Sequence, residues 1–254
     1  EIYGFGAGSG IGKTDFFLQQ AVADIEAGGG VAGFFLEQPV AETAKRFCGK
    51  QAKQRFHIPD IEFDTADLTA AFDALDASKV FLYDHFGAKD WDTIRDTIRW
   101  LFVTEGVRDF YVDHLTALVA FEDDERKALE RILAEMSGLA QELGICIYFI
   151  SHLATPEGKP HEEGGRVMAK HFKGSRAIIY WCHFMFAMER DTQAEDLEIR
   201  QTTTFRVLKD RFTGNATGLT FYLGYEQETG ILYQQPADWR PPETDSAGSG
   251  FTEY

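Results

Sequence analysis

The chain has 254 residues, 44% of them hydrophobic and 26% charged, which is typical of one globular domain with its own core. Its formal net charge of -16 argues against a broad, non-specific surface for polyanions, so any contact with nucleic acid must be local. Three widely spaced cysteines indicate neither a disulfide framework nor a zinc site, and no apolar stretch approaches the ~20 residues that cross a bilayer. We therefore expect a cytoplasmic protein without membrane contact.

Strands and helices are expected to alternate along the first 150 residues. Short apolar runs predict strands at 31–36, 80–83, 110–112 and 145–150. Helical periodicity predicts helices at 13–26, 40–55, 91–104 and 125–143. Such alternation is typical of an α/β fold with a mostly parallel sheet flanked by helices. The chain opens at Glu1 without methionine and reaches a glycine-rich loop almost at once, so we expect a further segment upstream.

The composition and the hydrophobic periodicity of the sequence change after residue 150. Residues 151–173 are polar, rich in Gly and Lys and without a period, which predicts a long functional loop. Further strands are expected at 183–188, 205–208, 220–223 and 231–233. The turn at 228–230 predicts a C-terminal β-hairpin. We expect one domain over 1–235, followed by an acidic flexible tail over 236–254.

Residues 7–14, AGSGIGKT, lie between an expected strand and a helix and match a P-loop, with Ala7 where the strict pattern has glycine. Glycines let the backbone N–H groups turn toward a phosphate, and the helix N-terminus adds positive potential. Lys13 is expected to reach the β- and γ-phosphates, and the Thr14 hydroxyl to bind Mg²⁺. The expected nucleotide-binding residues of the loop are Gly8, Ser9, Gly10, Ile11, Gly12, Lys13 and Thr14.

Three more polar residues follow expected strands. Asp113 can supply a second carboxylate beside the metal, and Glu37 can orient or deprotonate the attacking water. His152 opens the long polar loop and can contact the γ-phosphate from one side and the loop from the other. Each also has a plainer interpretation, as a turn aspartate, a solvated glutamate or a structural histidine. Lys209 and Arg211 end another expected strand, where a solvated edge is the plainer interpretation.

Seven short motifs occur in a fixed order along the chain. Together they resemble the helicase domain of T-odd phage primase-helicases, with mitochondrial Twinkle and bacterial DnaB as more distant relatives. The similarity extends from the P-loop to about Tyr233 and implies a RecA-like P-loop NTPase core. The motifs are GSGIGKT, FLE ending at Glu37, VDH around Asp113, SHL around His152, HEEG ending at Gly164, KGS beginning at Lys173 and KDRFTG around Arg211.

The resemblance implies a role for each matching residue. Glu37 matches the catalytic base, Asp113 the Walker B aspartate and His152 the γ-phosphate sensor. Arg211 matches the finger that acts on the neighbouring subunit's nucleotide, with Lys209 beside it. The resemblance also places Tyr225 on the nucleotide base, flanked by Arg190.

The resemblance places the family's DNA-binding loop at 154–173, with Lys159, Arg166, Lys173 and Gly174 as the expected DNA-binding residues. This loop is one residue shorter and poorer in lysine than the phage pattern, with Ala154 at one position.

The resemblance further implies a replicative helicase that forms a homo-hexameric ring and moves 5′ to 3′ on single-stranded DNA. Its substrate would be ATP or a dNTP with Mg²⁺, in the host cytoplasm if a phage encodes it. The acidic tail at 241–254 is similar to the segment with which phage relatives contact their polymerase. A RecA-class recombinase and a nucleotide-binding switch with little turnover are the alternatives.

Overall fold

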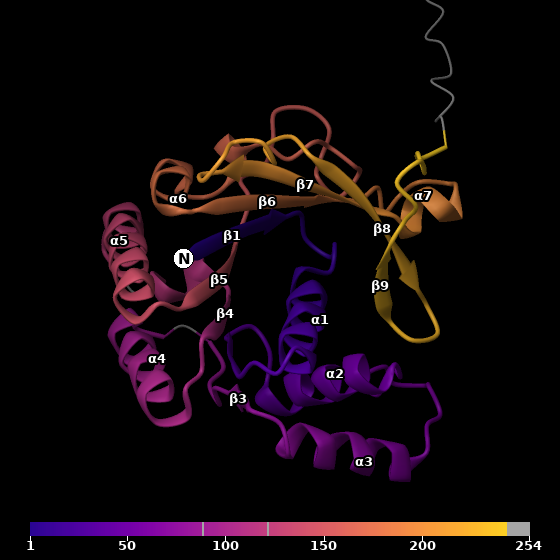
Figure 1. Cartoon of the computed structure of the whole chain (residues 1–254). Helices are drawn as coiled ribbons and strands as arrows, with labels where there is room; N and C mark the ends of the chain where they lie inside the picture. Colours follow the sequence, from indigo (N-terminus) through magenta and orange to yellow (C-terminus); the bar gives the residue numbers. More distant parts are fainter. Residues whose placement is uncertain (88, 121, 243–254) are drawn as a thin grey trace, which may run out of the picture.

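The computed structural model describes residues 1–87, 89–120 and 122–242 (Figure 1). The strands are β1 (Ile2–Ala7), β2 (Val31–Phe35), β3 (Val80–Leu82), β4 (Asp109–Asp113), β5 (Cys146–Ser151), β6 (Phe184–Glu189), β7 (Thr203–Asp210), β8 (Thr220–Glu226) and β9 (Ile231–Gln234). The α-helices are α1 (Lys13–Glu26), α2 (Val40–Ala52), α3 (Thr65–Asp76), α4 (Trp91–Glu105), α5 (Glu125–Leu143), α6 (Ser175–Trp181) and α7 (Leu197–Gln201). Two 3-10 turns, Leu115–Leu118 and Ala169–His171, complete these elements.

All strands in the described residues belong to one sheet, in the order β3-β2-β4-β5-β1-β6-β7-β8-β9. The strands from β3 to β6 in this order are mutually parallel, whereas β7, β8 and β9 are antiparallel to their neighbours. The carboxyl ends of the parallel strands therefore meet at one edge of the sheet. In such folds, ligands bind at this edge.

Successive side chains of a strand point to opposite faces of the sheet. Helices cover both faces, so the central strands are buried on both sides. On β4, Phe110 and Val112 join the core beneath α4 and α5, whereas Tyr111 meets Phe17 of α1 with ring centroids 5.3 Å apart. Figure 1 shows these two helical layers on opposite sides of the sheet. Each fully buried side chain of this size contributes roughly 1.5–3 kcal/mol, so the strand ends that carry the polar residues are firmly held.

The predicted alternation, the mostly parallel sheet and the C-terminal hairpin of β8 and β9 are confirmed. The helix expected over 40–55 is shorter, since Lys53 adopts a left-handed conformation with φ 54° and ends it at Ala52. Helix α3 was not predicted because it buries only Ala71 and so has almost no apolar stripe. Its first turn is capped by Asp64, whose side chain accepts from Ala66 N–H.

Most of the expected tail, 243–254, lies outside the described residues, and so do the acidic residues Glu243, Asp245 and Glu253. Within the described part, Trp239 packs against Tyr222 with ring centroids 4.9 Å apart and donates from Nε1 to Glu198 Oε1 at 2.8 Å. All three cysteines are free. None of the helices in the described ranges combines the length and apolar character needed to span a bilayer.

Candidate active site

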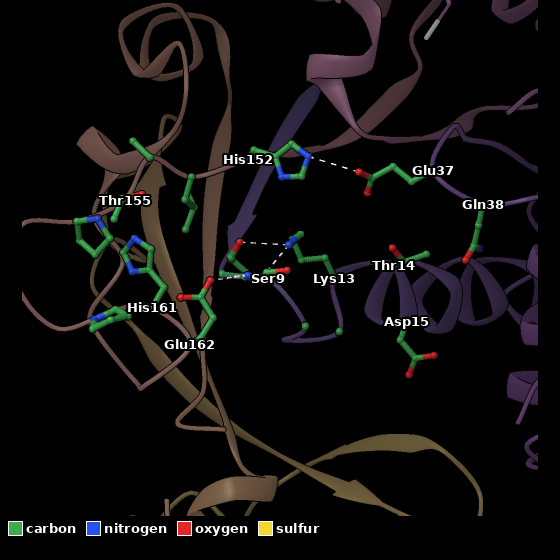
Figure 2. Close-up of a pocket in the computed structure, with 18 of the residues that line it drawn as sticks. Ser9, Lys13, Thr14, Asp15, Glu37, Gln38, His152, Thr155, His161 and Glu162 are labelled. Atoms are coloured by element: carbon green, nitrogen blue, oxygen red, sulfur yellow. Dashed lines mark hydrogen bonds and ion pairs between the residues drawn. The ribbon is translucent and has the colours of Figure 1, made fainter. Parts of the chain in front are cut away.

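The P-loop connects β1 to α1 at the carboxyl edge of the sheet. Gly10 and Gly12 have φ of 69° and 95°, a left-handed region that other residues rarely adopt, so the glycines are what allow the loop to turn. A cavity of about 500 Å³ opens over the loop (Figure 2). Glu37, His152 and Glu162 line it together with the loop residues. The sheet topology thus brings residues from four segments to one cavity.

Lys13 begins α1 and lies at the floor of this cavity. Its Nζ donates to Gly8 O at 2.9 Å and to Ala7 O at 3.2 Å (Figure 2). Burial lowers the pKa of Lys13, an effect opposed by the charges of Asp113 and Glu37. The Lys13 ammonium group is partly desolvated, and its hydrogen bonds go only to backbone carbonyls of the loop. It can therefore exchange these carbonyls for the stronger, charge-assisted hydrogen bonds of a phosphate group.

Thr14 and Asp113 form an oxygen pair next to Lys13. The Thr14 hydroxyl donates to Asp113 Oδ2, and Asp113 Oδ1 is buried without a hydrogen-bond partner among the described residues. Asp113 is only 2% exposed, and burial raises its pKa to about 6. Mg²⁺ prefers oxygen ligands such as hydroxyls and carboxylates, and the unpartnered Asp113 Oδ1 is free to act as a ligand to a cation. The pair therefore fits the predicted metal position.

Glu37 follows β2 and faces two histidines across the cavity. Its Oε1 lies 2.8 Å from His114 Nε2 and 3.5 Å from His152 Nε2, and its side chain is 50% exposed. Burial lowers the pKa of His152, and burial together with His152 lowers that of His114 to about 4. Potential metal-ligating atoms of the three residues lie within 4.8 Å of one another. The contacts of Glu37 with the two histidine rings already account for this closeness.

His114 is a site residue that the sequence did not reveal. It lies on the chain directly after Asp113 and is almost fully buried. Its ring stacks edge-on against His152, with centroids 4.0 Å apart, and its Nδ1 hydrogen-bonds with the hydroxyl of Thr116. The motif VDH contained the signal, a histidine at the end of a strand that already supplies a carboxylate.

Arg190 and Tyr225 lie on the side of the P-loop that faces β6 and β8. Arg190 Nη2 donates to Gly10 O at 2.9 Å. Burial lowers the pKa of Arg190, and the Tyr225 hydroxyl interacts electrostatically with it. Burial also raises the pKa of Tyr225. The structure thus brings the two residues expected around the nucleotide base together, next to the loop.

Lys209 and Arg211 lie at the other edge of the sheet. Because β7 runs antiparallel to β6, its carboxyl end lies beside the amino ends of β6 and β1. Arg211 N–H donates to His183 O at 2.9 Å, and Lys209 Nζ donates to Cys182 O at 2.6 Å. The length of β1, six residues at about 3.3 Å each, separates Arg211 from the P-loop of its own chain.

The expected DNA-binding residues occupy the long loop after β5 and its end. Arg166 is exposed, and exposed Lys159 forms an ion pair with Asp191 at 3.1 Å. Lys173 N–H donates to His152 O at 3.0 Å, so the end of the loop is tied to its beginning. Gly174 has φ 77° and caps α6. Both ends of the loop therefore lie next to His152, which is a residue of the cavity.

The fold and the cavity together define a P-loop nucleoside triphosphatase with a RecA-like sheet. The sequence matches the family described as the DnaB-like helicase C-terminal domain over residues 1–229, and the chain belongs to that family. The predictions of a RecA-like core and of a helicase motor domain are confirmed at the level of the family.

Individual relatives agree with this assignment. The DNA helicase/primase of Enterobacteria phage T3 is 32% identical over 256 residues, which cover 97% of this chain and 44% of that protein. The chain thus spans less than half the length of this relative.

Two solved structures share the fold. One of them, described as an ATPase domain, has a TM-score of 0.74 and 19% identity, covering 92% of this chain and 84% of that one. A DnaB-like replicative helicase, described with its interactions with primase, has a TM-score of 0.75 and 19% identity. It covers 91% of this chain and 57% of that one.

Proposed function

We propose that this chain is the motor of a replicative DNA helicase that hydrolyses ATP or a dNTP and moves 5′ to 3′ along single-stranded DNA. Family membership supports the class of motor. The observation that carries the proposal is that Glu37 and His152 line the same cavity as the P-loop, where the Thr14 and Asp113 oxygens meet. In the proposal, the P-loop holds the phosphates, Thr14 and Asp113 would hold the metal, Glu37 is the base and His152 is the sensor of the γ-phosphate.

The cavity residues divide the hydrolysis between them. Lys13 and the P-loop N–H groups hold the β- and γ-phosphates, and Mg²⁺ bound at Thr14 and Asp113 would neutralise charge on the phosphate oxygens. The Glu37 carboxylate accepts a proton from water as the water oxygen bonds to the γ-phosphorus. The bond from that phosphorus to the β–γ bridging oxygen breaks, and the nucleoside diphosphate leaves. Arg190 and Tyr225 hold the base of the nucleotide.

Arg211 acts on the nucleotide of a neighbouring chain in this proposal, with Lys209 beside it. Its place at the opposite edge of the sheet from the P-loop supports such a division. A homo-hexameric ring would bring the two edges of adjacent chains together. The finger then stabilises the charge on the transferred phosphoryl group from across the interface.

The 154–173 loop is the proposed contact to single-stranded DNA, through Lys159, Arg166, Lys173 and Gly174. His152 lies at its start and Lys173 N–H bonds back to it, so a change at the γ-phosphate can reach the loop directly. For Lys159, DNA would have to replace Asp191 as the partner. Phosphate contacts of this kind position the strand without reading its sequence.

Phosphate release, measured with and without single-stranded DNA, tests the proposal. A helicase motor should show strong stimulation and closed rings under the electron microscope. Filaments that lengthen with the DNA would indicate a recombinase instead, and nucleotide binding without stimulated turnover would indicate a switch. Binding of a polymerase to the acidic tail and a place in the host cytoplasm complete the proposal; residues 243–254 of this tail lie outside the described residues.

A further inference from the structure

His114 stands between the proposed base and a hydroxyl. Its Nε2 lies 2.8 Å from Glu37 Oε1, and its Nδ1 hydrogen-bonds with Thr116 Oγ1. An ionised carboxylate can only accept, so Nε2 carries the proton and donates to Glu37. In the neutral ring Nδ1 then has a free lone pair, and the Thr116 hydroxyl donates to it. One tautomer satisfies both contacts.

The side chains of His114 and Glu37 differ in how strongly their surroundings restrict them. The His114 side chain is 11% exposed, whereas that of Glu37 is 50% exposed and belongs to the segment after β2. A half-exposed carboxylate has several open rotamers, and a fixed donor selects one of them. We infer that His114, oriented by Thr116, is a positioning residue that holds the Glu37 carboxylate at the P-loop cavity beside His152. This inference rests on the proposed function, in which Glu37 is the base.

Thr116→Val is the sharpest test, because it removes the hydroxyl, keeps the shape and leaves both histidines in place. We expect kcat for DNA-stimulated hydrolysis to fall roughly fivefold, with KM within about twofold, as for the loss of one net hydrogen bond. Thr116→Ser should return most of the lost rate. Variants of the His114 imidazole test the same contact. His114→Gln, whose amide N–H can still donate to Glu37, should retain more activity than His114→Ala. Equal kcat for the Val and Ser variants, or a loss expressed in KM alone, would overturn the inference.

Glu37→Gln separates this inference from the function on which it rests. If Glu37→Gln turns over normally, the base has been assigned wrongly and the proposed mechanism fails. If Glu37→Gln is inactive while Thr116→Val is as fast as wild type, only the role of His114 and Thr116 fails. Unchanged melting temperatures and nucleotide affinities would show that the variants are folded.

A second inference comes from Glu162, which belongs to the 154–173 loop but reaches into the P-loop. Its Oε1 accepts from Ser9 N–H at 2.8 Å, as Figure 2 shows. A Cβ on Gly8 would lie only 2.8 Å from the same oxygen. The Ser9 hydrogen bond lowers the pKa of Glu162, and the charge of Lys13 acts in the same direction. An anionic oxygen thus occupies a loop whose N–H groups are suited to phosphate.

The backbone of Glu162 is anchored on the other side. Its carbonyl accepts from Thr192 N–H and from Thr192 Oγ1, both at 2.9 Å. The side chain and the main chain therefore link the P-loop, the proposed DNA loop and the segment after β6 at one residue. We propose that Glu162 is an internal stand-in for the nucleotide's phosphate, which nucleotide must displace, so that binding releases this part of the DNA loop.

Glu162→Ala tests the displacement, with Mg²⁺ and the non-hydrolysable analogue AMP-PNP as the probe. Without DNA, we expect the variant to bind AMP-PNP roughly tenfold more tightly, the scale of a charged hydrogen bond that no longer competes. Glu163→Ala, which removes the same charge one residue away, should stay within twofold of wild type. The effect of an oligo-dT strand on AMP-PNP affinity should shrink in Glu162→Ala.

Three results would overturn the second inference. Weaker AMP-PNP binding by Glu162→Ala would make Glu162 part of the nucleotide site, and equal gains in both variants would reduce the effect to general repulsion. The inference also rests on the proposed P-loop, so Lys13→Ala is measured alongside. Undiminished binding by Lys13→Ala would refute the P-loop assignment, whereas weak binding by that variant with no gain from Glu162→Ala would refute only the role of Glu162.

Discussion

Replacing Asp113 with asparagine should make the nucleotide-free protein more stable while abolishing its turnover. Asp113 is 2% exposed, one of its oxygens has no partner within the described ranges, and burial raises its pKa from 3.8 to about 6. The protein therefore keeps a poorly solvated charge where Mg²⁺ is expected to bind. Asparagine has nearly the same shape but removes the charge.

The size of the effect follows from the pKa. An increase from 3.8 to about 6 corresponds to about 3 kcal/mol of lost folding free energy once the carboxyl is ionised in both states. The folded state binds the proton more tightly, so the penalty is absent below about pH 4 and grows to its full size above about pH 6. For a chain of this length, 3 kcal/mol corresponds to a Tm increase of roughly 6–12 °C as an upper bound.

Thermal melting in EDTA at pH 7.5 and at pH 4.5 measures this difference. We expect the gain in Tm from Asp113→Asn to be about threefold larger at pH 7.5 than at pH 4.5. Exposed Asp123→Asn removes the same formal charge from the surface and should change Tm little. Mg²⁺ with nucleotide should stabilise wild type but hardly affect Asp113→Asn. A variant that melts below wild type at pH 7.5, or a gain that does not depend on pH, would refute the reasoning.

Further predictions concern turnover and DNA. Glu37→Gln should bind nucleotide normally but hydrolyse it at least ~100-fold more slowly in a phosphate-release assay, since the amide is a poor base. Arg211→Ala should lose roughly 10³-fold or more, and mixing it with Lys13→Ala should restore hydrolysis through composite sites, provided that mixed rings form. Lys159→Ala with Arg166→Ala should flatten the log-log salt dependence of single-strand affinity by about 1.4, or less if Asp191 already neutralises Lys159.

Local signals in the sequence were sufficient to predict four residues on the cavity side of the molecule. Lys13, Asp113, Glu37 and His152 each follow an apolar strand within a few residues, and parallel strands bring their carboxyl ends to one edge. The position of each residue along its own strand was therefore enough to predict that they meet.

The contacts that the sequence did not reveal join distant segments. Ser9 and Glu162 are 153 residues apart, and Lys159 meets Asp191 across 32 residues. Such pairs depend on how the long loop folds back over the sheet, which no period or motif describes. Likewise, the separation of Arg211 from the P-loop follows only once β7 is known to run antiparallel to β6.

Because the P-loop and Arg211 lie at opposite edges of the sheet, the number of complete active sites would depend on how many chains assemble and on whether the assembly closes. In the proposed assembly, each chain would offer its P-loop at one edge and Arg211 at the other, so contacts between copies would be head-to-tail. Each chain would then give its arginine to one neighbour and receive an arginine from another. An open string of n chains then contains n − 1 finished sites, because the chain at one end has a nucleotide but no incoming arginine. Closure into a ring completes the last active site, so every chain then has a complete site. Turnover per chain should therefore rise as assembly proceeds and level off once the rings are closed.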